Sequence, residues 1–268
     1  MSTRSRIAIV GVGNMGEAVL AGLVRSGRAP GDLFAGVRRP ERGEDLAQRY
    51  GVRALSAPEA AAEAEVVVLG VKPYDVVGVL SSLDLRAGQL VVSLAAGIPT
   101  DAMEAAVPDG VGVVRTMPNT PSHLGEGMTV VAGGASASED DVADAVALME
   151  AVGAVAVVAE KHVDAAAAIS GSGPAYVFYV AEALVEAGVH LGLPRATASQ
   201  LVTQTLAGSS LLLRETGEHP AVLREQVTSP GGTTAAALRV LESAAVRAAF
   251  LDATRANRDR SREIAAEG

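Results

Sequence analysis

The feature that most constrains the fold is a series of short, continuously apolar runs in the first part of the chain. A strand with one wet face alternates apolar and polar residues, whereas a strand covered on both faces stays apolar throughout. The runs therefore predict a mainly parallel sheet with helices on both sides. They are RIAIV (6–10), LFAGV (33–37), EVVVLGV (65–71), QLVVSLA (89–95), VGVVRT (111–116), MTVVAG (128–133) and VAVVA (155–159).

Helix-like stretches, notably residues 14–26 and 138–151, lie between several of these runs. Strand, helix and strand in alternation form the βαβ pattern of a doubly wound α/β domain. With 268 residues, the chain is also longer than one small domain. We therefore expect an α/β, Rossmann-type dinucleotide-binding domain over residues 1–160.

The rest of the chain, residues 161–268, shows no further strand-like run and is predicted to form an all-α domain. Its stretch 175–191 is apolar over most of the helix circumference. A helix of that kind is buried on nearly every side. Because so small a domain has little interior, we expect a second subunit to supply part of that burial.

Composition narrows the possible partners and chemistry. A net charge of −9 and a pI near 5.0 argue against nucleic acid or an anionic membrane as the main partner. The chain has no cysteine, and its histidines show no metal-binding spacing, so no metal site is expected. It lacks a convincing signal peptide and any run of about 18 apolar residues that could span a membrane. We expect a cytoplasmic protein. The histidines are His123, His162, His190 and His219.

The sequence IAIVGVGNMG places a G-x-G-x-x-G motif directly after the first strand and at the start of a helix. Gly11 permits the tight turn, Gly13 lets the backbone approach a pyrophosphate, and Gly16 allows close helix–strand packing. Helix N–H groups around Asn14 and Met15 face the anion. In this setting the motif favours dinucleotide binding over a plain glycine turn.

The end of the second strand bears on which dinucleotide is bound. An NAD site usually has an acidic residue there to accept the ribose 2′-hydroxyl. Here the chain has Arg38 and Arg39 instead, and guanidinium groups pair well with a 2′-phosphate. We favour NADPH, while NADH stays possible because these arginines could also be solvated loop charges.

Three further turns follow apolar strands, where ligands bind in open α/β sheets. A proline after a strand is also ordinary punctuation. We expect the three turns to form the floor of a nicotinamide pocket, with the side chain of Asn119 best placed to meet a carboxamide. Besides Asn119, the predicted residues are Val71, Lys72, Pro73, Ala95, Ala96 and Gly97.

Two glycine-rich motifs interrupt the helical part. In GSGPAY, Gly171, Gly173 and Pro174 break a helix and leave N–H groups free at the next helix start. The motif is either a simple kink or a wall of an anion or substrate site, and the residues alone do not decide between these readings.

In TSPGGTT (228–234), the glycines can turn backbone N–H groups inward as a nest before a helix predicted over 235–265. Such a nest recognises a small carboxylate. Alternatively, Thr233 or Thr234 is the N-cap. That explanation accounts for one hydroxyl and leaves Ser229 and the second threonine unexplained.

Together, GVGNMGEA, VKP, AAGI, MPNTP, GSGPAY and TSPGGTT closely resemble pyrroline-5-carboxylate reductases, in the same order and over nearly the whole chain. The resemblance implies NADPH-dependent reduction of the C=N bond of 1-pyrroline-5-carboxylate to L-proline. It also implies a helical domain that interlocks with a second subunit in a homodimer or larger homo-oligomer. Thr234 is implied to act catalytically near the ring nitrogen. The implied substrate-binding residues are Gly173, Ser229, Gly231, Gly232, Thr233 and Thr234.

Two other functions compete with this interpretation. A β-hydroxyacid dehydrogenase shares the domain layout but implies a lysine in the helical domain, whereas this chain has only Lys72 and Lys161. A non-catalytic NADP-sensing protein explains the N-terminal motif and the helical association surface. It leaves GSGPAY and TSPGGTT without a purpose.

Overall fold

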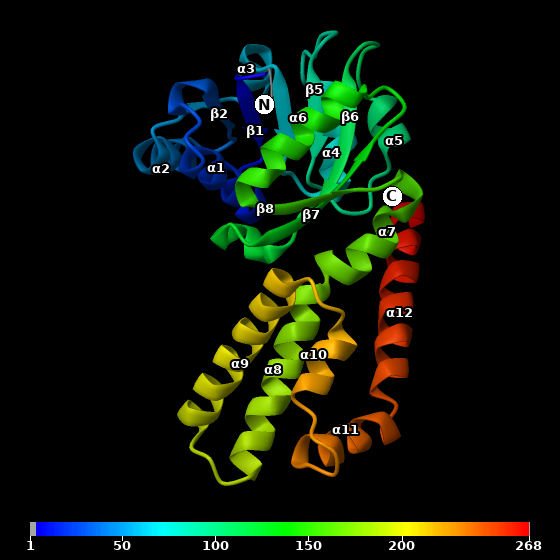
Figure 1. Cartoon of the computed structure of the whole chain (residues 1–268). Helices are drawn as coiled ribbons and strands as arrows, with labels where there is room; N and C mark the ends of the chain where they lie inside the picture. Colours follow the sequence, from blue (N-terminus) through cyan, green and yellow to red (C-terminus); the bar gives the residue numbers. More distant parts are fainter. Residues whose placement is uncertain (1–3, 268) are drawn as a thin grey trace. The chain divides into compact units, whose positions relative to one another are not determined.

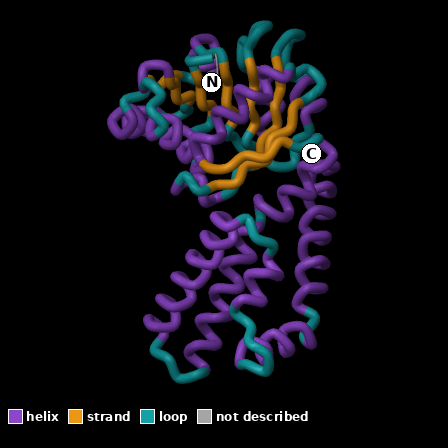
Figure 2. The backbone as a smooth tube through the Cα atoms, in the orientation of Figure 1, coloured by secondary structure: helices purple, strands orange, loops and turns teal. Residues whose placement is uncertain are grey.

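The computed structural model describes residues 4–267 and places its strands in one sheet (Figure 1, Figure 2). The strands are β1 (Ile7–Val10), β2 (Leu33–Gly36), β3 (Arg53–Leu55), β4 (Val66–Leu69), β5 (Leu90–Ser93), β6 (Gly112–Met117), β7 (Gly127–Gly133) and β8 (Gly153–Val157). Their order is β3-β2-β1-β4-β5-β6-β7-β8. All neighbours run parallel except β6 and β7. The predicted mainly parallel sheet is confirmed.

Of the strands in the described residues, β3 is the one that the apolar runs did not predict. It has three residues and pairs only with β2, at the edge of the sheet. Arg53 is exposed, and its guanidinium carbon lies 5.2 Å from the centre of the Phe34 ring. An edge strand this short needs no continuous apolar run, so the pattern used for the other strands misses it.

Helices cover both faces of the sheet. They are α1 (Asn14–Arg25), α2 (Pro40–Tyr50), α3 (Ala57–Glu63), α4 (Val76–Ser82), α5 (Thr100–Glu104), α6 (Glu139–Met149) and α7 (Val163–Ala166). Ile7 and Ile9 of β1 join a core that contains residues of α1, α2 and α6. Ala8 and Val10 join a second core with α3, α4 and α5. Because side chains alternate along a strand, each face has its own core.

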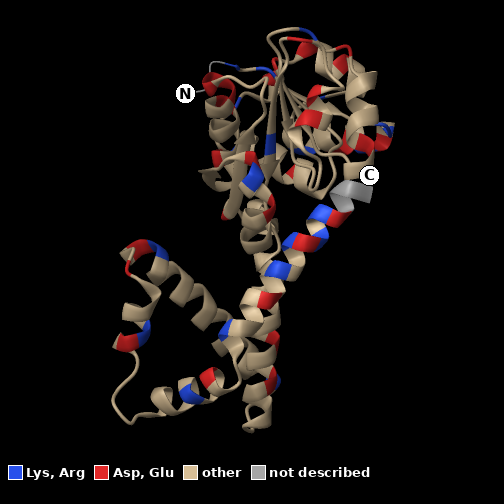
Figure 3. Ribbon diagram, turned by 90° about the vertical axis from the view of Figure 1, so that its right-hand side faces the viewer, with Lys and Arg blue, Asp and Glu red and all other residues tan. Residues whose placement is uncertain are grey.

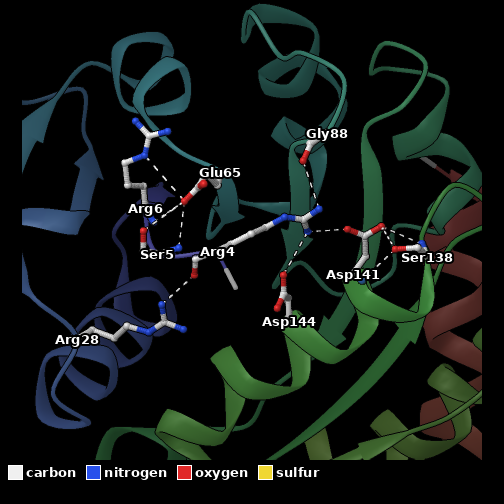
Figure 4. A network of polar contacts seen from close by, with 9 residues as sticks. All are labelled: Arg4, Ser5, Arg6, Arg28, Glu65, Gly88, Ser138, Asp141 and Asp144. Atoms are coloured by element: carbon white, nitrogen blue, oxygen red, sulfur yellow. Dashed lines mark hydrogen bonds and ion pairs between the residues drawn. The ribbon is translucent and has the colours of Figure 1, made fainter. Parts of the chain in front are cut away.

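A polar network anchors the segment before β1 at the amino ends of the strands (Figure 4). The guanidinium of Arg4 donates to Asp141 at 2.6 Å and to the Gly88 carbonyl at 3.3 Å, and it lies 3.6 Å from the Asp144 carboxylate. Ser138 and Asp141 form a capping box at the start of α6. Burial raises the pKa of Asp141, but hydrogen bonds from Ser138 and Arg4 outweigh burial and lower this pKa below its usual value.

The chain divides into two compact units. The α/β unit contains the residues up to Ser172 and those from Ala256 onward, and the helical unit runs from Gly173 to Arg255. The division does not fall after residue 160, the boundary expected from the sequence. This division reflects contacts within one chain. The boundary expected after residue 160 separates a cofactor-binding domain from a dimerisation and substrate-binding domain, and it stays a prediction.

Packing against the sheet explains why the α/β unit extends beyond the last strand. Val163 of α7 is buried and shares a small core with Val130 and Ala132 of β7. Ala168, in the π-helical turn after α7, is also buried. The start of the predicted all-α segment therefore belongs to the sheet unit by its contacts.

The helices that follow are α8 (Gly173–His190), α9 (Arg195–Thr216), α10 (Pro220–Gln226), α11 (Thr233–Ser243) and α12 (Val246–Glu267). The prediction of one helix over 235–265 is wrong. The helix is interrupted where Ala245 adopts a φ of +55°, and α11 closes with a hydrogen bond from Ala244 N–H to the Val240 carbonyl at 2.9 Å. No glycine or proline marks this break in the sequence.

The helical unit leaves most of its apolar surface uncovered within one chain. Among residues 173–255, all of which are described, only Ala198 is buried. It packs near Gly188, where α8 and α9 meet. Helix α8, expected to be buried on nearly every side, has no buried residue in the single chain. Figure 3 shows that α8 and α9 also carry few charged residues. None of the described helices is long and apolar enough to cross a membrane.

Candidate active site

The carboxyl ends of β2, β1, β4, β5 and β6 lie in register at one edge of the sheet. The aligned residues are Gly36, Val10, Leu69, Ser93 and Arg115. From β1 the chain adds β2 and β3 on one side of the sheet, and it then continues with β4 on the other side of β1. The gap between β1 and β4 is therefore a topological switch point, and ligands bind outside the carboxyl ends of the strands at such a point. The sheet therefore brings together the loops that carry the predicted cofactor residues.

The three glycines of the first motif differ in their surroundings. Gly11 has a φ of +85°, and a Cβ there would lie 2.8 Å from the backbone nitrogen of Val71. Gly16 is buried, and its Cβ would lie 2.7 Å from the carbonyl oxygen of Gly11. Gly13 is exposed and has nothing within 4 Å of a Cβ position. The geometry matches a tight turn, a close helix–strand contact and an open approach for a pyrophosphate.

The start of α1 fits a dinucleotide phosphate. Gly13 is the N-cap and supplies no side chain, and its carbonyl accepts the hydrogen bond from Glu17 N–H at 2.8 Å. The N–H groups of the first helical residues, which include Asn14 and Met15, have no intrahelical partner. Asn14 is exposed, whereas Met15 is partly buried against the core. Free N–H groups at a helix N-terminus suit an anion.

Four arginines follow β2, and the structure separates them into two kinds. Arg38 and Arg39 are exposed, and neither side chain makes a hydrogen bond or ion pair within residues 4–267. Arg42 and Arg49 are engaged with Glu17 and neighbouring groups. The two arginines predicted to meet a 2′-phosphate are therefore the two of these four whose side chains have no hydrogen-bond or ion-pair partner in the described part of the chain.

The turns after β4 and β5 combine buried anchors with accessible residues. Gly97 has a φ of +79° and has nothing within 4 Å of a Cβ position. The proline after β4 opens a short 3₁₀ turn. Ala95 is buried, Val71, Pro73 and Gly97 are partly buried, and Lys72 and Ala96 are exposed.

Asn119 is placed at the same edge, but its side chain already has partners. Its Nδ2 donates to the carbonyl of Ser170 at 2.9 Å, and its Oδ1 accepts from the N–H of Met128 at 2.8 Å. The side chain is buried. Asn119 thus joins two segments of the chain, and its second Nδ2 hydrogen and the second lone pair of Oδ1 are left for a carboxamide.

The segment GSGPAY joins the two units. Its first part is a π-helical turn, and a Cβ on Gly171 would lie 2.8 Å from the Met117 side chain. The hydroxyl of Ser172 accepts a hydrogen bond from Asn257 at 2.9 Å. Gly173 begins α8 and has nothing within 4 Å of a Cβ position. A side chain at Gly171 would displace the end of the Met117 side chain, whereas Gly173 leaves open space.

In the helical unit, TSPGGTT forms a tight turn that leads into α11. The N–H of Gly232 donates to the Ser229 carbonyl at 3.0 Å, and Gly231 has a φ of +67°. A proline followed by a glycine of positive φ is typical of a type II turn. A Cβ on Gly232 would lie 2.2 Å from the Ser229 hydroxyl and 3.1 Å from the Ser229 carbonyl oxygen, so a side chain at this position would force Ser229 to shift.

The N-cap of α11 is Gly232, and no side chain caps this helix. The alternative in which Thr233 or Thr234 is the N-cap is therefore wrong. Neither threonine hydroxyl makes a hydrogen bond within the described residues, and Thr234 is partly buried. The first N–H groups of α11 and these hydroxyls are available to a ligand.

Sequence reasoning missed a buried ion pair under this edge of the sheet. Arg115 of β6 is 6% exposed and lies 3.0 Å from Asp164 and 3.8 Å from Glu160. Glu160 also accepts hydrogen bonds from the N–H and the hydroxyl of Thr100. The pair joins β6 to the start of the α7 region. An arginine inside a Val-rich run was the available signal.

Fold and site define a dinucleotide-dependent oxidoreductase of the Rossmann type. Two family models match the chain. One, described as "NADP oxidoreductase coenzyme F420-dependent", matches residues 6–97. The other, described as "Pyrroline-5-carboxylate reductase dimerisation", matches residues 160–264. The N-terminal and helical parts are thus matched by separate models.

Relatives match over nearly the full length. The pyrroline-5-carboxylate reductase of Corynebacterium melassecola is 46% identical, over 96% of this chain and 98% of that protein. The Escherichia coli K12 protein of the same name is 40% identical, over 92% and 94%. Among solved structures, that of a pyrroline-5-carboxylate reductase from Coxiella burnetii has a TM-score of 0.93 at 37% identity, covering 97% of this chain and 98% of that one. The Plasmodium falciparum structure, solved with NADP bound, has a TM-score of 0.85 at 27% identity, with 99% of each chain covered.

The chain belongs to the pyrroline-5-carboxylate reductase family. The predicted function, NAD(P)H-dependent reduction of the C=N bond of 1-pyrroline-5-carboxylate to proline, is confirmed by these comparisons. The predicted fold class is confirmed as well. The dimerisation model supports a homo-oligomer. The β-hydroxyacid dehydrogenase alternative is set aside.

Proposed function

We propose that the chain divides this reduction between two sites, one in each unit. The carboxyl edge of the sheet holds NADPH, and the turn at 229–234 holds the carboxylate of the substrate. The observation that carries the proposal is the bare start of α11, where a glycine cap leaves N–H groups and two threonine hydroxyls without partners in the described chain. A small anion bound there is held by backbone donors.

In the α/β unit, each predicted residue takes one part of the cofactor. The N–H groups from Gly13 to Gly16 hold the pyrophosphate, and Arg38 and Arg39 hold the 2′-phosphate. The turns at 71–73 and 95–97 form the floor of the nicotinamide pocket. Asn119 holds the neighbouring segments at Met128 and Ser170 in place beside that pocket. When bound, the cofactor supplies the hydride.

In the helical unit, the chain orients a substrate that is already reactive. Protonation of the ring nitrogen makes the imine carbon electrophilic, so a strong protein acid is not required. The N–H groups of Gly231 to Thr234, together with Ser229, hold the carboxylate, and the hydroxyl of Thr234 meets the ring nitrogen. Gly173 leaves room for the substrate at the start of α8. Alignment of two reactants can lower a barrier by about 7–11 kcal/mol.

The finer statements about partners and location are also part of this proposal. The working form is a homodimer or a larger homo-oligomer, joined through residues 161–268 as a functional domain. The uncovered apolar surface of α8 and α9 supports this assembly. The net charge of −9 supports the absence of nucleic acid and anionic membrane as partners. We place the protein in the cytoplasm.

Thr234→Ala tests the assignment of the substrate site. We expect turnover of 1-pyrroline-5-carboxylate to fall about 100-fold, because the hydroxyl that orients the ring nitrogen is lost. The measurement follows loss of NADPH absorbance, with NADPH affinity measured separately by fluorescence. Thr216→Ala is the control, since that exposed hydroxyl bonds only backbone groups close in the chain: it donates to the Leu212 carbonyl at 2.8 Å and accepts from the Glu218 N–H at 3.3 Å. Unchanged turnover in Thr234→Ala removes this residue from the mechanism, and loss of NADPH affinity contradicts the division into two sites.

A further inference from the structure

Arg42 is the arginine of α2 that reaches the glycine-rich loop. Its Nη2 lies 3.3 Å from the carbonyl oxygen of Val12, the residue between Gly11 and Gly13. The same nitrogen pairs with the carboxylate of Glu17, and Nη1 lies 2.5 Å from Asp45. One guanidinium therefore connects the first turn of α2 to the loop that approaches the pyrophosphate.

Glu17 is held from three directions in this cluster. Arg49 lies 2.6 Å from its second oxygen, and the hydroxyl of Tyr50 donates to that oxygen at 2.9 Å. Burial raises the pKa of Glu17, but hydrogen bonds from Arg42, Tyr50 and Arg49 outweigh it and lower this pKa. A carboxylate in the first turn of α1 is thereby kept charged and paired beside the proposed phosphate site.

The turn that carries Arg38 and Arg39 lies between two fixed points. On one side, the N–H of Val37 donates to the Leu55 carbonyl at 3.0 Å, which continues the strand pairing. On the other side, Pro40 begins α2, and Arg42 holds the first turn of that helix against the loop. The free arginines themselves have no partner in residues 4–267 that would hold them in place.

We propose that Arg42 is a positioning residue for cofactor selectivity. It holds the turn with Arg38 and Arg39 at a set distance from the pyrophosphate loop, so that both guanidinium groups reach the 2′-phosphate of NADPH. This inference rests on the proposed function of those two arginines. Arg42 itself already pairs with the carboxylates of Glu17 and Asp45 and with the Val12 carbonyl, so its role in this inference is to hold the turn and not to bind the phosphate. NADH, which lacks the 2′-phosphate, depends little on Arg42.

The test compares Arg42→Met with Arg49→Met. Both variants remove one guanidinium from Glu17 and one positive charge, but only Arg42 bonds the Val12 carbonyl. In Arg42→Met we expect the ratio of kcat/KM for NADPH over NADH to fall about tenfold, through a higher KM for NADPH with little change in kcat. Arg49→Met is expected to keep the ratio of the unaltered protein. Arg42→Lys restores the charge without the fork and is expected to be intermediate.

Direct binding of NADPH and NADH, measured by fluorescence, accompanies the kinetics and does not depend on the imine substrate. An Arg38→Ala, Arg39→Ala double variant is measured in parallel. If the double variant loses the NADPH preference while Arg42→Met and Arg42→Lys keep it, the positioning role is overturned and the proposed function stands. If the double variant keeps the preference, the proposed 2′-phosphate site fails, and the inference fails with it. An equal fall in Arg49→Met shows a charge effect and also overturns the inference.

Discussion

Val77 on α4 and Val177 on α8 are both exposed valines, at 43% and 51% of their surface, yet their helices have different surroundings. Helix α4 also buries Val76 and Leu80 against the sheet. Helix α8 buries no residue within one chain. In the α/β unit the chain covers its own apolar surface. In the helical unit the same kind of surface stays uncovered within one chain, and the proposed homo-oligomer, which the dimerisation family model supports, would cover it.

The largest expected effect separates these two valines. Val177→Glu places a charge in the proposed subunit interface, where an unpaired charge is costly. We expect the dimer dissociation constant to rise about 100-fold or more and turnover to fall with it. Light scattering at several protein concentrations measures the mass. Val77→Glu is the matched control and is expected to leave mass and turnover unchanged. A Val177→Glu protein that stays dimeric contradicts the contrast between the two helices.

A second prediction separates folding from binding inside the α/β unit. Gly11→Ala combines a strained positive φ with contacts to Val71 and Gly70, and it should lower the free energy of unfolding by about 2–4 kcal/mol. Gly13→Ala has open space, so stability should change by less than about 1 kcal/mol. Its Cβ occupies the phosphate approach, and NADPH affinity should fall at least about tenfold. Urea unfolding and fluorescence titration measure the two effects. Equal stability of the two variants would contradict these roles.

The third prediction concerns the network at the amino ends of the strands. The lowered pKa of Asp141 means that its charged form stabilises the folded state at neutral pH. That contribution is lost as the pH falls below about 4, through the depressed pKa. Asp141→Asn should lower the free energy of unfolding by about 1–2 kcal/mol at pH 7, and the difference from the unaltered protein should shrink in acid.

Urea unfolding at neutral and acid pH measures this dependence. Asp140→Asn, at the exposed neighbouring position in the same first turn of α6, is the control and should change stability little. A difference between Asp141→Asn and the unaltered protein that persists at low pH argues against a role for the Asp141 charge.

The smallest effect is expected in the helical unit. Glu186 and Arg195 form an ion pair at 2.8 Å, but both side chains are more than half exposed. Arg195 lowers the pKa of Glu186, yet solvent screens such a pair. Glu186→Gln should leave the melting temperature unchanged within measurement. A clear drop would mean that this pair is covered in the assembled protein, which would sharpen the map of the interface.

Local patterns predicted the strands of the sheet and the turns at their ends well. Each apolar run overlaps a strand, and β1, β2, β4 and β5 are buried at every residue, whereas β8 at the edge of the sheet has no buried residue. The three-residue strand β3, which begins at the exposed Arg53, was missed because so short an edge strand carries no such run, whereas β8 at the other edge does. The break at Ala245 was missed because alanine gives no local signal for a left-handed residue. Helix α10 was likewise not predicted.

The candidate site was predicted in its motifs but not in its contacts. Gly11, Gly13 and Gly16 have the surroundings that their spacing indicates. Asn119 was expected to face a carboxamide, which stays a prediction, and its side chain also joins Ser170 to the Met128 backbone. That pairing joins residues far apart in the chain, and nothing in MPNTP points to it.

The sequence by itself determined the α/β and helical parts, the glycine turns and the family of this protein, because each depends on residues close together in the chain. Only the tertiary structure decided which arginines after β2 form ion pairs within the chain and which have no side-chain partner in the described residues. Arg42 and Glu17 meet because α1 and α2 pack on the same face of the sheet. A long charged side chain pairs with whichever opposite charge lies within its reach. Which charges lie within reach is set only when the helices pack.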